Sequence, residues 1–234
     1  MKLVFDIGYN IGAFTEACLD KNKDCKVVAI DANPRLCALS KHKENKNVKV
    51  MNLLVSKGDN QEIDFYVDPI NIGISTASKS FMESSRFAKG SKYLQENTGK
   101  WTNIGKIKTV SLDTLIRFYG TPDLIKVDVE GYEKEVFSGL TKKSAKKICF
   151  ECHEEEKDSL YEIMEYLSDL GYQQFGLIGY FEEKDNFEKL TYSEYGDPHL
   201  IEPERYYHKE ELKEEIEKCF TKERRVNYGM MWVK

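Results

Sequence analysis

The chain has 234 residues, of which 41% are hydrophobic and 32% are charged, a composition typical of a globular protein. Its length favours one domain with a sizeable core. The formal net charge of −5 provides no overall basic field, so we expect no nucleic-acid partner. No run reaches the roughly 18 apolar residues of a membrane span, and the N-terminal end lacks a signal-peptide pattern. We therefore expect a cytoplasmic protein whose six cysteines are reduced.

Short apolar runs alternate with helical patterns along most of the chain. Continuous apolar runs are typical of parallel strands that are buried on both faces. This succession predicts an α/β fold with a doubly wound sheet. The predicted strands are residues 3–5, 27–30, 48–55, 124–127, 148–150 and 226–233.

Two stretches, at about 68–108 and 180–225, interrupt the alternation of strands and helices. The first is polar and is predicted to be irregular, although its residues 73–76 offer hydroxyls to a ligand. The second combines aromatic residues with a helical pattern striped by Leu212 and Ile216. We interpret both as insertions that shape the substrate pocket, and we predict a single domain over residues 1–234.

A glycine-containing turn, D-I-G-Y-N-I-G at residues 6–12, follows the first strand and precedes a helix. Glycines let the chain reverse tightly and let a ligand approach the backbone. Asp31 ends the second strand, where an acidic side chain can accept hydrogen bonds from both hydroxyls of a ribose. Together these features favour a cofactor that contains adenosine.

The turn differs from a dinucleotide-binding loop in ways that favour S-adenosylmethionine. Asn10 replaces the middle glycine, and the spacing to Gly12 is short. Asp6 would repel phosphates and attract an ammonium group. NAD binding, or a purely structural turn without a cofactor, are the alternatives at this point.

The segment at residues 122–133 is the densest in chemically active residues. It places Lys126, Asp128 and Glu130 at alternate positions near the end of the fourth strand. Strand periodicity would point all three side chains the same way. Ligands of open α/β sheets bind outside the carboxyl ends of the strands, so these residues and the Gly8 turn are expected to line one crevice.

These motifs resemble the FkbM family of class I S-adenosylmethionine-dependent methyltransferases. The matching segments are residues 6–12, 31–34, 52–56, 111–115, 125–131 and 150–153. The resemblance implies a Rossmann-like sheet of seven mostly parallel strands, the last one antiparallel. It also implies an enzyme that uses S-adenosyl-L-methionine to methylate a hydroxyl of a sugar, glycan or similar small acceptor.

Carried over by position, the resemblance assigns the methionine end of the cofactor to the 6–12 turn, the ribose to Asp31 and the adenine to residues 54–56. The predicted cofactor-binding residues are Asp6, Gly8, Asn10, Gly12, Asp31, Ala32, Leu54, Val55, Ser56 and Asp128. The predicted catalytic residues are Asp128, Glu130, His153, Lys126 and Glu151. Asp128, Glu130 and His153 are the candidate bases, with Lys126 as an orienting partner.

Several alternatives stay open at this point. His153 could be a core histidine that a carboxylate satisfies, and Glu130 could cap the following helix. Asp128 and Glu151 could together hold Mg²⁺, but no third ligand is visible, and we assign no metal ligand. The chain could also be a non-catalytic module that binds the cofactor or a glycan. Because only two residues precede Leu3, it is either a compact enzyme or one domain of a longer polypeptide.

Overall fold

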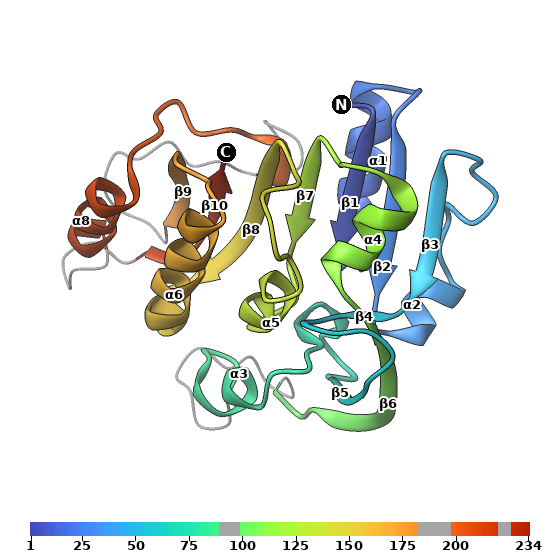
Figure 1. Cartoon of the computed structure of the whole chain (residues 1–234). Helices are drawn as coiled ribbons and strands as arrows, with labels where there is room; N and C mark the ends of the chain where they lie inside the picture. Colours follow the sequence, from blue (N-terminus) through green and yellow to red (C-terminus); the bar gives the residue numbers. More distant parts are fainter. Residues whose placement is uncertain (89–98, 182–197, 220–225) are drawn as a thin grey trace.

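The computed structural model describes residues 1–88, 99–181, 198–219 and 226–234. Its centre is a seven-stranded sheet in the order β3-β2-β1-β7-β8-β10-β9 (Figure 1). β10 runs antiparallel to both of its neighbours, and the pairs from β3 to β8 are parallel. The predicted doubly wound sheet with an antiparallel last strand is confirmed. The strands are β1 (Leu3–Ile7), β2 (Lys26–Asp31), β3 (Val48–Asn52), β7 (Leu124–Val127), β8 (Lys147–His153), β9 (Phe175–Phe181) and β10 (Val226–Val233).

Helices cover both faces of this sheet. In Figure 1, α4, α5 and α6 lie in front of it and α1 lies behind. The α-helices are α1 (Ala13–Lys21), α2 (Pro34–Ala38), α3 (Lys79–Ser84), α4 (Leu112–Tyr119), α5 (Glu133–Phe137), α6 (Lys157–Asp169) and α8 (Lys209–Cys219). Three short 3-10 helices are η1 (Ile72–Ile74), η2 (Glu154–Glu156) and η3 (Pro198–Leu200). Among the described helices, none combines the length and the apolar character needed to cross a membrane.

The hydrophobic core is divided by the sheet, because successive strand residues point to opposite faces. Phe5 packs into the cluster that includes buried residues of α4, α5, α6 and α8. Its neighbour Val4 packs on the other face with Phe14 of α1 and Trp232 of β10. Burying each such side chain contributes about 1.5–3 kcal/mol, so packing on both faces stabilises the sheet.

The helix boundaries follow from local capping. The Asn33 side chain accepts a hydrogen bond from the backbone nitrogen of Arg35 at 3.0 Å, and Pro34 occupies the first position of α2. The Ser111 hydroxyl accepts one from the Thr114 nitrogen at 3.2 Å and starts α4. Gly120 ends α4 with a φ of 95°. These caps were all predictable, because each depends only on neighbouring residues.

The predicted strand 48–55 is two strands in different sheets, which corrects the sequence interpretation. β3 ends at Asn52, whose side-chain amide donates hydrogen bonds to the carbonyl oxygens of Asp31 and Ala32. These hydrogen bonds lie where the pairing of β3 with β2 ends, at Asn52 and Asp31. The chain then enters β4 (Leu54–Val55), which belongs to a three-stranded sheet in the order β4-β6-β5.

The 68–108 stretch is also more regular than predicted. It contains α3 and most of β6 (Thr102–Val110), which pairs with β5 (Glu62–Val67). Most of β6 is exposed and lacks the apolar alternation that identifies a half-buried strand, so periodicity missed it. In Figure 1 this small sheet and α3 lie beyond the carboxyl ends of the central parallel strands.

The 180–225 stretch falls partly on residues 182–197 and 220–225, which lie outside the described residues. The helix predicted within it is α8. Leu212 and Ile216 of this helix are buried against the sheet, as the apolar stripe predicts.

Candidate active site

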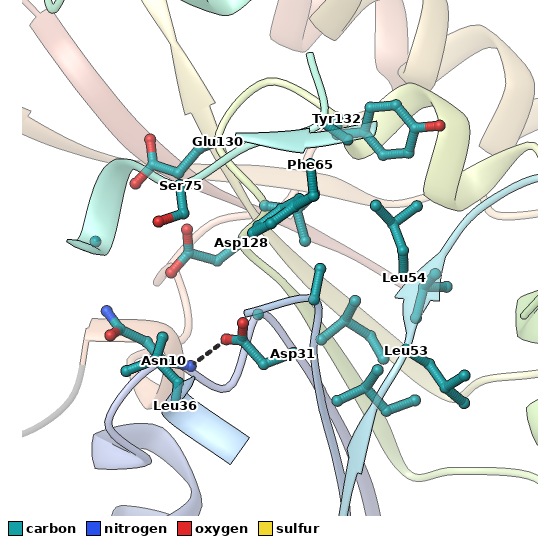
Figure 2. Close-up of a pocket in the computed structure, with 18 of the residues that line it drawn as sticks. Asn10, Asp31, Leu36, Leu53, Leu54, Phe65, Ser75, Asp128, Glu130 and Tyr132 are labelled. Carbon is teal, nitrogen blue, oxygen red and sulfur yellow. Dashed lines mark hydrogen bonds between the residues drawn. The ribbon is translucent and has the colours of Figure 1, made fainter. Parts of the chain in front are cut away.

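A cavity of about 220 Å³ opens at the carboxyl ends of the central strands. Figure 2 shows polar side chains, among them Asn10, Asp128 and Glu130, at one end of it. Leu53 and Leu54 lie at the other end, and Phe65 lies between the two groups. The cavity therefore has a polar half and an apolar half. It is lined by Ile7, Gly8, Asn10, Ile30, Asp31, Ala32, Leu36, Leu53, Leu54, Val55, Phe65, Ile72, Gly73, Ser75, Ala77, Asp128, Val129, Glu130, Tyr132, Glu151 and His199.

The turn after β1 is built around Gly8. This residue has a φ of +82°, and a Cβ added to it would lie 1.8 Å from the carbonyl oxygen of Asp128. The ends of β1 and β7 therefore approach so closely that only glycine fits without displacement. The close approach brings the turn and Asp128 to the same wall of the cavity.

Asp31 connects this turn to the end of β2. One of its carboxylate oxygens accepts a hydrogen bond from the Asn10 nitrogen at 2.7 Å, shown dashed in Figure 2. The other accepts one from the Asn33 nitrogen at 2.7 Å. Burial raises the pKa of Asp31 to about 6, although these backbone donors oppose the shift. A carboxylate thus lines the cavity with acceptor positions left for a ligand.

The side chain of Lys126 holds the turn after β1 from its buried side. Its ammonium donates a hydrogen bond to the Gly8 carbonyl oxygen at 2.7 Å and lies 3.4 Å from Asp6 and 3.3 Å from Asp128. Asp6 also accepts a hydrogen bond from the Thr15 hydroxyl at 2.6 Å. Asp6 is fully buried and does not line the cavity, contrary to its predicted place beside the methionine end of a cofactor. The Asp6 and Lys126 side chains therefore contact each other rather than the cavity.

The chain after β7 is not the regular strand that alternation of side chains predicts. β7 stops at Val127, and Glu130 has a φ of 54°, in the left-handed region. Lys126 and Asp128 still contact each other, but the chain bends before Glu130. The alternative in which Glu130 caps α5 is wrong, because that helix starts at Glu133 without a side-chain cap.

Glu130 reaches a second group of charged residues at the end of β8. The Nε2 atom of His153 lies 3.3 Å from a Glu151 oxygen and 3.9 Å from a Glu130 oxygen. Glu130 and Glu151 line the cavity, whereas His153 lies behind them with its ring 5.7 Å from that of Phe81. Burial would lower the pKa of His153, but the two carboxylates outweigh it and raise that pKa to about 10.

Sequence reasoning missed His199, which η3 brings to the cavity wall. Its Nε2 atom lies 3.5 Å from Asp128, and its ring packs edge-on against Phe14 at 5.9 Å. Burial would raise the pKa of Asp128, but Lys126 and His199 hold that pKa below its ordinary value. No motif surrounds His199, so only the fold shows that it approaches Asp128.

The predicted cofactor residues divide into two groups. Seven of them line the cavity: Gly8, Asn10, Asp31, Ala32, Leu54, Val55 and Asp128. Gly12 instead starts α1, where an added Cβ would lie 2.4 Å from the Tyr9 hydroxyl. Ser56 is buried with its hydroxyl 3.2 Å from that of Tyr132. Of the predicted polar segment 73–76, Gly73 and Ser75 line the cavity.

Phe65, Leu36 and Tyr132 also line the cavity but were absent from the prediction. Phe65 belongs to β5, which the sequence did not identify as a strand. Tyr132 follows the acidic motif directly, and this adjacency was the one signal that could have singled it out.

Comparison with known families and proteins adds independent evidence. A family model described as the methyltransferase FkbM domain matches residues 6–173. The chain is 30% identical over 142 residues to the hexuronic acid methyltransferase AglP of Haloferax volcanii. This match covers 59% of the chain and 50% of AglP, so the chain spans about half the length of that relative.

The chain also matches solved structures of methyltransferases. The methyltransferase FkbM from Methylobacillus flagellatus KT has a TM-score of 0.48 and 15% identity, covering 76% of this chain and 40% of its own. A SAM-dependent O-methyltransferase from Thermotoga maritima has a TM-score of 0.43 and 11% identity, covering 99% of this chain and 58% of its own.

Proposed function

The chain belongs to the FkbM methyltransferase family, and we propose that it uses S-adenosyl-L-methionine to methylate a hydroxyl of a sugar, glycan or similar small acceptor. The observation that carries this proposal is the position of Asp31. Its carboxylate faces a cavity at the end of β2, directly beside the Gly8 turn. This is where an adenosine ribose is bound in folds of this kind.

The two halves of the cavity match the two ends of that cofactor. The apolar side chains of Leu53, Leu54 and Phe65 suit an adenine ring. At the other end, the Asn10 side-chain oxygen is buried and accepts no hydrogen bond. That oxygen and the Asp128 carboxylate suit the ammonium group of a methionine moiety, because buried acceptors need donors.

When bound, the cofactor supplies a methyl group on a positively charged sulfur. The contribution of the protein is to hold an acceptor oxygen in line with the methyl carbon and the sulfur, which can provide about 7–11 kcal/mol. The acceptor hydroxyl must also lose its proton. Asp128, Glu130 and Glu151 form a carboxylate wall that can receive it, with His153 behind them.

We assign acceptor binding to the two insertions of a single methyltransferase domain over residues 1–234. Ser75 from the first insertion and His199 from the second line the cavity next to the carboxylate wall. The relative from Haloferax volcanii is named for a hexuronic acid, and this name supports a sugar acceptor. We propose a small-molecule or glycan partner on these grounds.

The proposal is tested by calorimetric titration with S-adenosylhomocysteine, followed by turnover assays. Turnover is measured as release of S-adenosylhomocysteine across a panel of neutral sugars, uronic acids and glycosides. We expect binding by the intact protein and turnover with at least one sugar. Absence of cofactor binding would reject the proposal, and binding without any turnover would favour a non-catalytic module.

The carboxylate wall is tested separately on the accepted sugar. Asp128→Asn should reduce turnover about 10²–10⁴-fold if this side chain serves as the base or holds the cofactor ammonium. Asp158→Asn, on the exposed side of α6, is the matched control. Full turnover by Asp128→Asn would show that neither role belongs to this residue.

A further inference from the structure

Three side chains with metal-ligand atoms lie close together at the edge of the cavity, those of Glu130, Glu151 and His153. One ligand atom from each of the three residues lies within 4.8 Å of the other two. Ligand atoms about 2.1 Å from a common metal ion are separated by roughly 3.4 Å, so small side-chain rotations would complete such a shell. The three residues come from two elements, the loop after β7 and the end of β8.

The positions of these ligands are set by their surroundings. The Thr76 hydroxyl donates a hydrogen bond to the backbone carbonyl of Glu130 at 2.7 Å and holds the left-handed turn. The His153 ring packs against Phe81. Supports of this kind orient metal ligands before an ion binds. One Glu130 carboxylate oxygen is buried and has no hydrogen-bond partner, so an acceptor is available for a cation.

The charge around this cluster is unbalanced. Besides the carboxylates of Glu130 and Glu151, those of Asp128 and Glu133 also lie close enough to interact with Glu130. Buried carboxylates must gain protons or cations to be tolerated. A proton on His153 and a divalent ion are two alternative ways to balance the same group.

We propose that Glu130, Glu151 and His153 form a binding site for a divalent transition-metal ion such as Mn²⁺ or Zn²⁺. Two carboxylates and one imidazole suit these ions better than Mg²⁺, which prefers oxygen ligands alone. Both carboxylates line the cavity while His153 lies behind them, so an ion held by this set has an open side facing the cavity.

This site would extend the proposed function, on which its catalytic meaning rests. An acceptor hydroxyl bound at the open side would lose its proton more readily, because a metal ion lowers the pKa of a bound oxygen acid. Asp128 also lines the cavity and is outside the ligand set, and we assign it to receive that proton. The acceptor oxygen then bonds to the methyl carbon as the carbon–sulfur bond breaks and its electron pair stays on sulfur.

The first experiment uses the unmodified protein. EDTA-treated, desalted protein is titrated with Mn²⁺ and followed by electron paramagnetic resonance. We expect one bound equivalent, and spin-echo modulation from a directly coordinated imidazole nitrogen. Zn²⁺ should displace the Mn²⁺, and a large excess of Mg²⁺ should not. Absence of stoichiometric binding, or binding without nitrogen modulation, would overturn the proposal.

Variants then assign the ligands. Glu151→Gln and His153→Gln should each weaken Mn²⁺ binding by at least about tenfold, and His153→Gln should lose the nitrogen signal. Glu44→Gln and His208→Gln, both at exposed positions, are matched controls outside the cluster. Unchanged affinity in both cluster variants would reject this ligand set, and the spectrum of the unmodified protein decides the matter if a variant fails to fold.

The outcome is separable from that of the proposed function. Calorimetry with S-adenosylhomocysteine on the metal-free protein tests the cofactor site alone, because Asp31 and the Gly8 turn are not in the ligand set. Cofactor binding without Mn²⁺ binding removes only the metal site. Mn²⁺ binding without cofactor binding removes the proposed methyl transfer and leaves a metal-binding protein.

Discussion

Replacing Asp31 by asparagine tests the cofactor site most directly. The two carboxylate oxygens already accept hydrogen bonds from the nitrogens of Asn10 and Asn33, each at 2.7 Å. A carboxylate offers about four lone-pair positions, so one on each oxygen remains for the two ribose hydroxyls. Asparagine keeps a single acceptor oxygen and turns its amide group toward a backbone donor, so it loses both the charge and one acceptor.

The size of the effect follows from those contacts. Hydrogen bonds to charged groups contribute roughly 1.5–3 kcal/mol, and neutral ones about half as much. Losing one such bond and weakening the other should cost about 3 kcal/mol, which corresponds to a Kd roughly a hundredfold higher. The assay is calorimetric titration with S-adenosylhomocysteine at pH 8, where Asp31 is ionised because its pKa is about 6.

The control is Asp24→Asn on the exposed turn before β2, which should leave the Kd unchanged. Thermal unfolding verifies that both variants are folded. A Kd for Asp31→Asn within threefold of the unmodified protein would refute the assignment of the ribose to this carboxylate.

Further predictions concern Asp31, Lys126 and Gly8. Protonation of Asp31 should weaken S-adenosylhomocysteine binding up to about tenfold for each pH unit below its pKa of about 6, measured by calorimetry. Folding stability should depend on pH in the opposite direction to binding. Because folding raises the pKa of Asp31 from 3.8 to about 6, its contribution to the free energy of unfolding is complete below about pH 4 and is lost as the pH rises through 6. Lys126→Met should reduce the free energy of urea unfolding by about 3–5 kcal/mol, because it leaves buried Asp6 without its cation. Gly8→Ala should abolish cofactor binding, because the added Cβ would lie 1.8 Å from a backbone oxygen.

Each of these predictions has a control that isolates its cause. The Kd of Asp31→Asn should depend less on pH than that of the unmodified protein. An unchanged dependence would show that another group titrates. Lys134→Met removes an exposed ion pair with Glu162 and should cost less than about 1 kcal/mol. Gly105→Ala also has a positive φ but meets nothing within 4 Å. Cofactor binding by Gly8→Ala as tight as by Gly105→Ala would contradict the steric argument.

The part of the cavity that we assign to the cofactor could be predicted because its information is local. Gly8 and Asp31 each follow a strand that the apolar pattern identifies. Parallel neighbouring strands bring such residues to the same edge without any knowledge of distant contacts. The caps at Asn33 and Ser111 are local in the same sense, since the side chain and its backbone donor are two or three residues apart.

Other parts of the cavity could not be predicted in this way. Phe65 lines the cavity because β5 pairs with β6, a mostly exposed strand that lacks apolar alternation. Glu130 reaches Glu151 because the chain bends after β7, whereas period-two reasoning requires a regular strand. These positions depend on packing between segments, and such packing leaves no periodic signal in either segment.

One residue, Lys126, indicates contacts with residues that are distant from it in the sequence. It interrupts an otherwise apolar strand, and a buried ammonium is tolerated only when carboxylates and carbonyl groups surround it. Asp6 lies on the neighbouring strand and Asp128 follows Lys126 by two residues, so both partners are implied once the strand order is known. His199 has no counterpart of this kind, because Asp128 is already paired without it. The Asp128 carboxylate, for which we propose a base or cofactor role, is therefore held by one contact that the sequence implies, with Lys126, and by one that only the fold provides, with His199.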